Sequence, residues 1–421
     1  MLLFVSCVGL AGVASGQTVR TWTSNSDQRW SRNANWSGSN APNASNEIAE
    51  FGTGSQLNPQ LNANNYTVRG ISFSTGAGSY VVGDDNGSRT LKIGNGSGGF
   101  IENLSGNDQL ISIATLQFQS SATISTSGTG ALAISSTLTG NNPNLTFDAT
   151  SDITVSGNIT TSGGTLTKQG TGNLNLSGAN SYTGQTTLSA GAIVLQAANV
   201  FADSGQISIF SGATLRLNDL TDIIGGVTGS GAIDFGSAGT GQLTLGAGTS
   251  TFAGSFLGSG SLVIGAGATL ALGADFSNSS LNIILDGGSL NLSGHSLSIG
   301  SLNVSGNSLI DFSASSNSVL QTNSLGFANT GLLLTVQNWA DAADYFYSQT
   351  GYAQGSAPLD QVQFQGWTTS DTKWQSYDNQ ITPVPEPGAY GAVFLAAGLA
   401  IVGIRRRRQR EGVQPDGWKQ Q

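Results

Sequence analysis

Closely spaced carboxylates are the first residues that could do chemistry, because glycoside hydrolysis requires two carboxyl groups that face one sugar bond. Two pairs can be nominated, Asp219 with Asp222 and Asp84 with Asp85. The second pair begins the run Asp-Asp-Asn-Gly, which is typical of a hairpin turn, and Asp286–Gly288 is interpreted as another hairpin turn. The sequence therefore favours solvated turn carboxylates over a catalytic pair.

Other groups that could support catalysis or hold a metal are sparse. Residues 84–88 lack the alternating oxygen ligands and the terminal Glu of a calcium-binding hand. A polysaccharide lyase would need a basic residue beside acids that hold a cation, and the lysines between Gln17 and Gly388 are Lys92, Lys168 and Lys373. The sole histidine, His295, lies between two predicted strands, and one histidine alone forms neither a catalytic triad nor a zinc site. We therefore predict a protein without enzymatic activity, metal or cofactor.

A motif near the C-terminus indicates processing. Pro385, Glu386 and Pro387 form a stiff, extended segment that a processing enzyme could bind as a strand. Residues 388–404 carry no charge, and as a helix they would span about 25 Å, the short end of a bilayer crossing. The sequence thus predicts a transmembrane helix over 388–404. The arginines that follow would act as a membrane stop on the cytoplasmic side: Arg405, Arg406, Arg407 and Arg408.

This combination resembles the PEP-CTERM sorting signal, and the resemblance covers residues 383–410. It implies recognition during export by exosortase, a membrane transpeptidase of bacteria that make extracellular polysaccharide. The expected partners are therefore an exosortase-type processing enzyme, the membrane before processing, and extracellular polysaccharide. The tail 411–421, which includes Trp418, departs from the usual pattern.

The N-terminus has the features of an export signal. An apolar run from Met1 to Ala14 ends in small residues before Gln17, which is typical of a secretory signal peptide, so residues 1–16 are predicted to be removed. The only cysteine, Cys7, lies in this segment, and a lipoprotein signal around it is the weaker alternative. The mature chain would then depend on hydrogen bonds and packing, without disulfides.

Composition predicts a turn-rich, all-β fold for the exported part. Glycine accounts for 60 of the 421 residues, about twice its ordinary share, while 38% of residues are hydrophobic and 9% are charged. The net charge is −9, and acids outnumber bases by 22 to 9 between Gln17 and Gly388. Since phosphate binding relies on clustered Lys and Arg, nucleic acid is excluded as a partner.

Short strand-and-turn units recur along the middle of the chain. Leu174 and Leu176 alternate with polar neighbours in the period-two pattern of a half-buried strand, so both are predicted to point inward. Residues 171–176 match 240–245, and a shorter element recurs at 212–217, 267–272 and 287–292. Such units bury their apolar face only by stacking. We predict a right-handed parallel β-helix with about 12 to 15 coils, with a β-sandwich as the alternative.

One segment, 164–199, resembles the passenger-associated transport repeat, also called the autotransporter-associated β-strand repeat. In autotransporters this repeat belongs to the exported β-helical passenger, so the resemblance implies an exported solenoid. The matching positions are Leu166, Thr167, Lys168, Gly170, Gly172, Leu174, Leu176, Gly178, Ala179, Asn180, Tyr182, Gly184, Thr187, Gly191 and Leu195.

Tryptophans are confined to the two ends, with none between positions 37 and 338. One cluster is Trp22, Trp30 and Trp36, and the other is Trp339, Trp367 and Trp374. Solenoids need distinct end caps, and a carbohydrate-stacking platform is the alternative role for each cluster. The predicted organisation is a signal peptide (1–16), a Trp-rich cap (17–70), the repeat solenoid (71–335), a cap and linker (336–382), the sorting signal (383–410) and a cytoplasmic tail (411–421).

These features together predict an exported structural solenoid of the cell surface or extracellular matrix, anchored by its C-terminal helix before processing. An adhesin or carbohydrate-binding surface protein is the alternative. A β-helical enzyme that acts on glycans is the third hypothesis, which the scarcity of basic residues disfavours.

Overall fold

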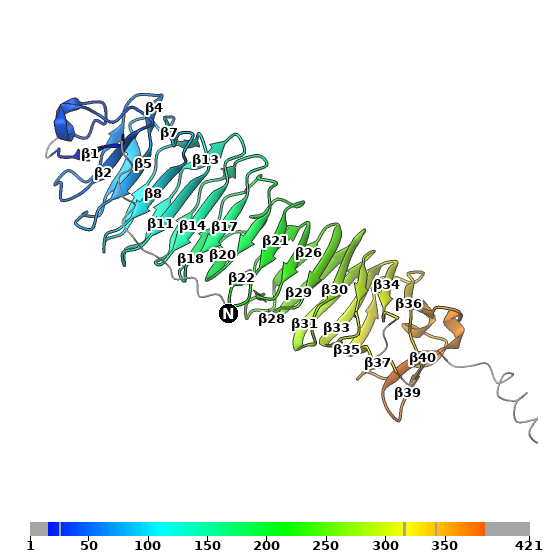
Figure 1. The fold of residues 1–421 in the computed structure, drawn as a ribbon. Coiled ribbons are helices and arrows are strands. Elements are labelled where there is room, and N and C mark those ends of the chain that lie inside the picture. Colours follow the sequence, from blue (N-terminus) through cyan, green and yellow to red (C-terminus); the bar gives the residue numbers. More distant parts are fainter. Residues whose placement is uncertain (1–15, 25–26, 315–316, 342, 384–421) are drawn as a thin grey trace, which may run out of the picture.

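The computed structural model describes residues 16–24, 27–314, 317–341 and 343–383. There the chain winds into an elongated rod of about 14 stacked turns (Figure 1). Apart from two antiparallel pairings at the C-terminal end, the strands of each coil pair in parallel with those of the coils before and after it. This pairing confirms the predicted all-β solenoid and its number of coils, and it excludes the sandwich alternative, whose sheets would be antiparallel.

Four sheets form the walls of the rod in the described part of the chain. The long sheet has 16 strands: β1 (Thr18–Trp22), β2 (Glu47–Phe51), β5 (Gly70–Phe73), β8 (Gly99–Asn103), β11 (Ala122–Thr126), β14 (Leu145–Ala149), β17 (Leu166–Gln169), β19 (Thr186–Leu188), β21 (Gln206–Ile209), β24 (Gly226–Gly229), β27 (Gly248–Phe252), β30 (Ala268–Leu272), β32 (Ser289–Asn291), β34 (Ser308–Asp311), β36 (Leu334–Gln337) and β38 (Val362–Phe364).

The other walls are shorter: the second and third sheets run side by side through the N-terminal coils, and the fourth begins before the second ends. The second sheet contains β3 (Gln60–Leu61), β6 (Val81–Asp84), β9 (Gln109–Ile111), β12 (Leu132–Ile134), β15 (Ile153–Val155), β18 (Asn173–Leu176), β20 (Ala192–Leu195), β22 (Thr214–Arg216), β25 (Ala232–Asp234) and β28 (Ser255–Leu257). The third sheet contains β4 (Tyr66–Val68), β7 (Thr90–Ile93), β10 (Thr115–Phe118), β13 (Thr137–Gly140) and β16 (Ile159–Thr160).

The fourth sheet forms a wall of the C-terminal half. It contains β23 (Thr221–Ile224), β26 (Gly241–Leu245), β29 (Gly260–Gly265), β31 (Phe276–Asp286), β33 (Ser296–Gly306), β35 (Val319–Phe327), β37 (Tyr345–Ser348), β40 (Gln380–Pro383) and β39 (Thr372–Gln375). Single turns of 3-10 helix occur at η1 (Asn33–Asn35), η2 (Ser37–Ser39), η3 (Leu359–Gln361) and η4 (Thr369–Asp371).

Coil length in the middle of the rod is close to 21 residues. Leu145 of β14 pairs with Leu166 of β17, which in turn pairs with Thr186 of β19. The long sheet continues from β1 to β38, so its ladder also runs through the regions predicted as caps.

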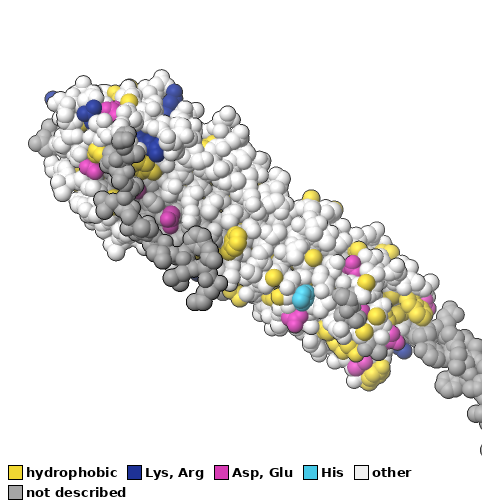
Figure 2. All heavy atoms as spheres, viewed as in Figure 1, with side chains coloured by type: hydrophobic (Ala, Val, Ile, Leu, Met, Phe, Trp, Pro, Cys, Tyr) yellow, Lys and Arg dark blue, Asp and Glu magenta, His cyan; other side chains and the backbone are white. Residues whose placement is uncertain are grey.

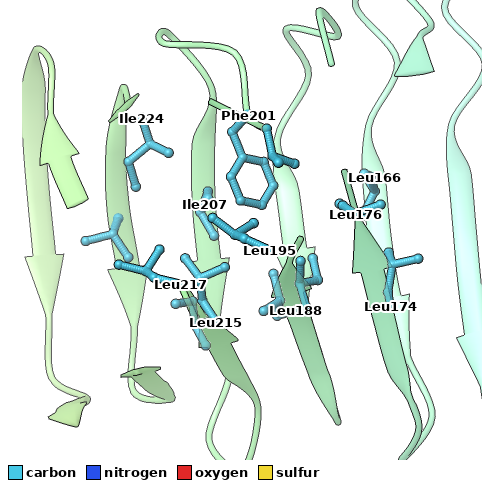
Figure 3. Packing of buried hydrophobic residues seen from close by; sticks show 14 of the residues in the cluster. Leu166, Leu174, Leu176, Leu188, Leu195, Phe201, Ile207, Leu215, Leu217 and Ile224 are labelled. Atoms are coloured by element: carbon cyan, nitrogen blue, oxygen red, sulfur yellow. The ribbon is translucent and has the colours of Figure 1, made fainter. Parts of the chain in front are cut away.

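The alternation of apolar and polar residues produces the core. Leu174 and Leu176 of β18 are fully buried, whereas Asn175 between them is half-exposed. Successive coils place further leucines and isoleucines beside these two (Figure 3). The predicted inward direction of both leucines is confirmed, and each fully buried leucine contributes about 1.5 to 3 kcal/mol relative to exposure.

The turns at 84–87 and 286–288 are corners between walls, so the predicted hairpins are wrong. β6 ends at Asp84 in the second sheet, and the next strand, β7, belongs to the third. Likewise β31 ends at Asp286 in the fourth sheet, and β32 begins in the long sheet. Each short strand turns its apolar face into the core and pairs through its edges with the coils before and after it. The chain therefore turns into the next wall instead of folding back on itself.

Glycine permits close approach where coils stack at the corners. A Cβ atom at Gly157 would lie 1.9 Å from the carbonyl oxygen of Ser136, in the preceding coil. No side chain fits at that distance, which explains a glycine at this position.

The second sheet merges into the fourth at β31. Near the start of β31, the side chain of Asn278 donates a 3.1 Å hydrogen bond to the carbonyl of Phe256 in β28, the last strand of the second sheet. Further along, Leu281 pairs with Gly260 of β29 in the fourth sheet. A register shift between Asn278 and Asn282 marks the bend. After it, the outer face of the fourth sheet is continuous up to the C-terminal end of the rod.

The recurring sequence elements do not always lie on the same wall. Residues 171–176 include β18 of the second sheet, whereas the matching 240–245 include β26 of the fourth. The element at 212–217 lies on the second sheet, and those at 267–272 and 287–292 lie on the long sheet. The repeat thus defines a strand and its turn, but it does not define the wall.

The expected transmembrane helix over 388–404 and nearly all of the expected signal peptide, 1–16, lie outside the described residues. Across the ranges that the structure does describe, none of the helices is long and apolar enough to cross a membrane.

Candidate functional site

Asp222, one of the carboxylates nominated for catalysis, is buried and bound to backbone. Its Oδ2 accepts hydrogen bonds from the N–H groups of Val200 (2.9 Å) and Phe201 (3.2 Å), and its Oδ1 accepts one from Ile223 (2.8 Å). Burial raises the pKa of Asp222 to about 6, although these hydrogen bonds oppose the shift. Its carboxylate therefore ties one coil to the previous one.

Asp219, its nominated partner, serves a different turn. Its two carboxylate oxygens accept hydrogen bonds from the backbone N–H groups of Ser237 (3.1 Å) and Ala238 (2.7 Å). The two acids thus hold separate backbone segments, and the structure does not combine them into a site.

Asp84 and Asp85 are turn residues, as the sequence indicates. Asp84 accepts hydrogen bonds from the backbone N–H groups of Asn86 (3.1 Å) and Ala114 (2.7 Å). Asp85 forms an ion pair with Arg89 at 2.8 Å, and its hydrogen bond with this guanidinium lowers the pKa of the carboxyl. Each acid has a structural partner of its own.

The parallel register forms a row of carboxylates that sequence reasoning missed. Glu50, Ser72 and Glu102 are paired across β2, β5 and β8. The Ser72 hydroxyl donates a 2.8 Å hydrogen bond to Glu102, and Thr21 donates one of 2.9 Å to Glu50. Burial raises the pKa of Glu102, and the charge of Glu50 raises it further. The row depends on the register between successive coils, so it could have been predicted only if the number of residues in each of these coils were known.

Lys168 is a fully buried cation on β17. Its ammonium group donates hydrogen bonds to the carbonyl oxygens of Gln169 (2.6 Å), Gly170 (2.9 Å) and Ala190 (3.3 Å). Burial lowers the pKa of Lys168 to about 8. The ammonium group therefore links backbone carbonyls at the corner of its own coil to one at the corner of the next coil, and these hydrogen bonds hold the two corners together.

His295 lies in the turn between β32 and β33, as predicted. Its Nδ1 is 3.3 Å from Oδ1 of Asp275, which also accepts a 2.9 Å hydrogen bond from the backbone N–H of Ser296. These contacts lower the pKa of Asp275, the Ser296 hydrogen bond most of all. Within the described residues, no three His, Cys, Asp or Glu side chains are grouped as a metal site would require.

The N-terminal tryptophans fill the end of the core. Trp22, Trp30 and Trp36 are at most 2% exposed, and the ring centroids of Trp30 and Trp36 are 4.8 Å apart. Each indole N–H donates to a backbone carbonyl. Rings buried in this way offer no face to a sugar, which argues against the platform alternative at this end.

The C-terminal tryptophans, Trp339, Trp367 and Trp374, are partly buried and pack against the core. A different pair of aromatic residues lies on the outer face of β37. The rings of Tyr345 and Tyr347 are parallel within 5°, with centroids 5.6 Å apart. Sequence reasoning overlooked them, although Tyr-Phe-Tyr alternation with a buried Phe346 predicts two tyrosines on one face of a strand.

A shallow hollow lies beside this tyrosine pair, where β35, β37 and the turn between β39 and β40 meet. It is lined by Gln321, Tyr347, Gln349, Asp378 and Asn379. The colour given to hydrophobic side chains, a class that includes tyrosine, gathers at this end of the rod in Figure 2. The hollow thus combines an aromatic ring with amide and carboxylate groups.

The residues assigned to sorting lie outside the described part of the chain. They are Pro385, Glu386, Pro387 and the arginines Arg405, Arg406, Arg407 and Arg408. Their roles therefore stay predictions from the sequence.

Comparison with known protein families places one segment of the chain. Residues 166–195 match the passenger-associated-transport-repeat family, within the segment where the sequence resembles that repeat. No curated protein and no solved structure matches the chain. The matched residues form β17 to β20, two strands each of the long and second sheets, and they include Lys168. The solenoid and this repeat together suggest an extracellular or surface structural protein.

Proposed function

We propose that this protein is an exported structural rod of the cell surface or extracellular matrix. The observation that carries the proposal is the ladder of the long sheet, which continues from β1 to β38 over a single apolar core. Asp219, Asp222 and Lys168 are engaged with backbone groups of this framework. The match to a passenger repeat at 166–195 supports export.

The C-terminal signal supplies the sorting step of this proposal. An exosortase-type enzyme recognises Pro385-Glu386-Pro387 while the apolar segment 388–404 and the following arginines hold the chain in the membrane. After processing, the rod associates with extracellular polysaccharide. The proposal assigns the protein no enzymatic activity of its own and no nucleic acid partner.

The test compares sorting of the wild type with that of Glu386→Ala in a host that carries an exosortase. Wild type should shift to the processed size and appear in the surface or matrix fraction on immunoblots. Glu386→Ala should retain the unprocessed size in the membrane fraction, while Glu411→Ala, an acid outside the motif, should behave as wild type. Normal maturation of Glu386→Ala would contradict the sorting assignment.

The structural role is tested separately on purified protein. Incubation with acidic and neutral polysaccharides should release no products, as followed by unsaturated uronate absorbance and by reducing ends. Turnover that survives purification to homogeneity would instead support the glycan-active hypothesis.

A further inference from the structure

We propose that the hollow lined by Gln321, Tyr347, Gln349, Asp378 and Asn379 is a binding site for a neutral saccharide. The inference deepens the proposed function, since it assigns the polysaccharide contact to one end of the rod, and its biological meaning rests on the proposed surface location.

The aromatic wall of the site is Tyr347. Tyr345 precedes it by two positions on the same face of β37 and stacks on its ring, while Gln349 follows by two positions. Tyr345 covers one face of the Tyr347 ring and does not line the hollow, so the opposite face of Tyr347 is the one available to a ligand there. Such a supported ring can pack against the C–H face of a pyranose.

Polar groups around this ring have unused hydrogen-bonding capacity. The side-chain amides of Gln321, Gln349 and Asn379 make no hydrogen bond to any residue in the described ranges. Asp378 uses Oδ1 to accept a 3.1 Å hydrogen bond from the N–H of Gln380, which leaves Oδ2 for a ligand. Amides supply both donors and acceptors and a carboxylate supplies acceptors, which matches the paired hydroxyls at the edge of a sugar ring.

The backbone holds these groups in place. Gln321 and Tyr347 are register partners in adjacent strands. The carbonyl of Asn379 accepts a 2.9 Å hydrogen bond from the N–H of Ser348, and its own N–H donates to Gln375 at 2.8 Å. The φ of Asn379 is +65°, a left-handed conformation that asparagine tolerates. The turn that carries Asp378 is thereby fixed against β37, as a preorganised site requires.

Charge selects a neutral ligand. Asp378 is the single charged residue among the described side chains that line the hollow, so a uronate or a sulfated sugar would face an unfavourable carboxylate without a compensating Lys or Arg. Burial raises the pKa of Tyr347, with Tyr345 and Asp378 raising it further. Its hydroxyl therefore stays protonated and able to donate at neutral pH.

The site is open toward the rod, which favours a chain of sugars over a single one. Ser277, Ser298, Gln321 and Tyr347 are paired in one row across β31, β33, β35 and β37. These side chains lie on the outer face of the fourth sheet, where none of them is buried. An oligosaccharide whose terminal or internal unit stacks on Tyr347 can extend along this row.

The test uses the purified full-length chain on an array of neutral and acidic glycans, followed by titration calorimetry with the best neutral oligosaccharide. Wild type should bind neutral glycans, and Tyr347→Ala should weaken binding about tenfold or more, while Tyr347→Trp, which retains an aromatic face, should restore it. Asp378→Ala should also weaken binding. The matched control is Tyr377→Ala, which removes a tyrosine that is 82% exposed in the same turn but does not line the hollow.

The outcomes separate this inference from the proposed function. Absence of binding to every neutral glycan, binding of acidic glycans alone, or equal binding by wild type and Tyr347→Ala each overturns the site. None of these results affects the sorting test on Glu386, because that test reads localisation. Circular dichroism and the melting temperature of Tyr347→Ala should match those of wild type, so that a loss of binding cannot be attributed to unfolding.

Discussion

At the scale of single residues, neighbouring positions on β18 have opposite environments. Leu176 is fully buried and Asn175 is half-exposed. Leu176→Asp would bury an unpaired carboxylate in the stacked core and cost several kcal/mol of stability, whereas Asn175→Asp should cost little. In limited proteolysis, the first variant should be cut near position 176 well before the second. Equal protease resistance of the two variants would contradict the buried face.

Lys168 provides a prediction of pH dependence. Its folded-state pKa of about 8 lies below its ordinary value of 10.5, so between these values the unfolded chain binds a proton that the folded chain has released. Stability must therefore rise with pH across this window, while below about pH 8 the contribution is constant.

The measurement compares wild type with Lys168→Met, which has no titrating amine. From pH 7.5 to pH 10, the difference in unfolding free energy should shift in favour of wild type by on the order of 2 kcal/mol. Titration of other groups cancels in the difference. A difference that stays constant over this range would show that burial does not perturb the amine.

At the scale of elements, the corners determine how closely coils can stack. Gly157→Ala would place a methyl group 1.9 Å from the carbonyl oxygen of Ser136, so neighbouring backbones would have to separate. We expect a loss of about 1 to 3 kcal/mol or more, seen as a lower melting temperature. Gly96→Ala is the matched control, because no atom of the described residues, its two sequence neighbours aside, lies within 4 Å of its Cβ position, and it should change stability by less than about 0.5 kcal/mol. Similar melting temperatures for both variants would contradict the tight corner.

The elements also show where sequence reasoning succeeds. Alternation around Leu174 predicts the buried face correctly, because inward and outward positions depend on local chemistry alone. The hairpins predicted at 84–87 and 286–288 fail, since Asn-Gly and Gly-Gly turns suit corners and hairpins alike. The matching segments 171–176 and 240–245 fall on different walls. The wall on which a strand lies depends on the number of residues in every coil before it, and a short repeat does not specify those lengths.

The hollow could not be predicted for a related reason. Gln321 and Tyr347 meet through the register of adjacent coils, and Asp378 joins them because β40 returns antiparallel to β37. Small differences in coil length would place other residues beside the tyrosine. Tyrosine alternation in the strand indicates an aromatic face, but apart from Gln349 its polar neighbours come from other segments of the chain.

At the scale of the whole molecule, the distribution of tryptophan separates the ends from the middle. The described tryptophans lie at the two ends of the ladder, whereas the coils between them pack through aliphatic side chains and phenylalanines. Since each coil contacts only its neighbours, stability is spread along the rod. Indole fluorescence therefore reports on unfolding of the two ends, and unfolding of the middle coils has to be followed by circular dichroism.

The shape of the rod gives the last prediction. With 16 strands in the long sheet and about 4.8 Å between stacked strands, the ladder is about 70 Å long. Small-angle scattering from residues 16–383 should therefore give an asymmetric distance distribution, with a peak at the width of one coil and a tail that reaches at least this length. A compact chain of this size would have a radius of gyration of about 21 Å, and the rod must exceed it. A symmetric distribution with the compact value would mean that the coils do not stack end to end in solution.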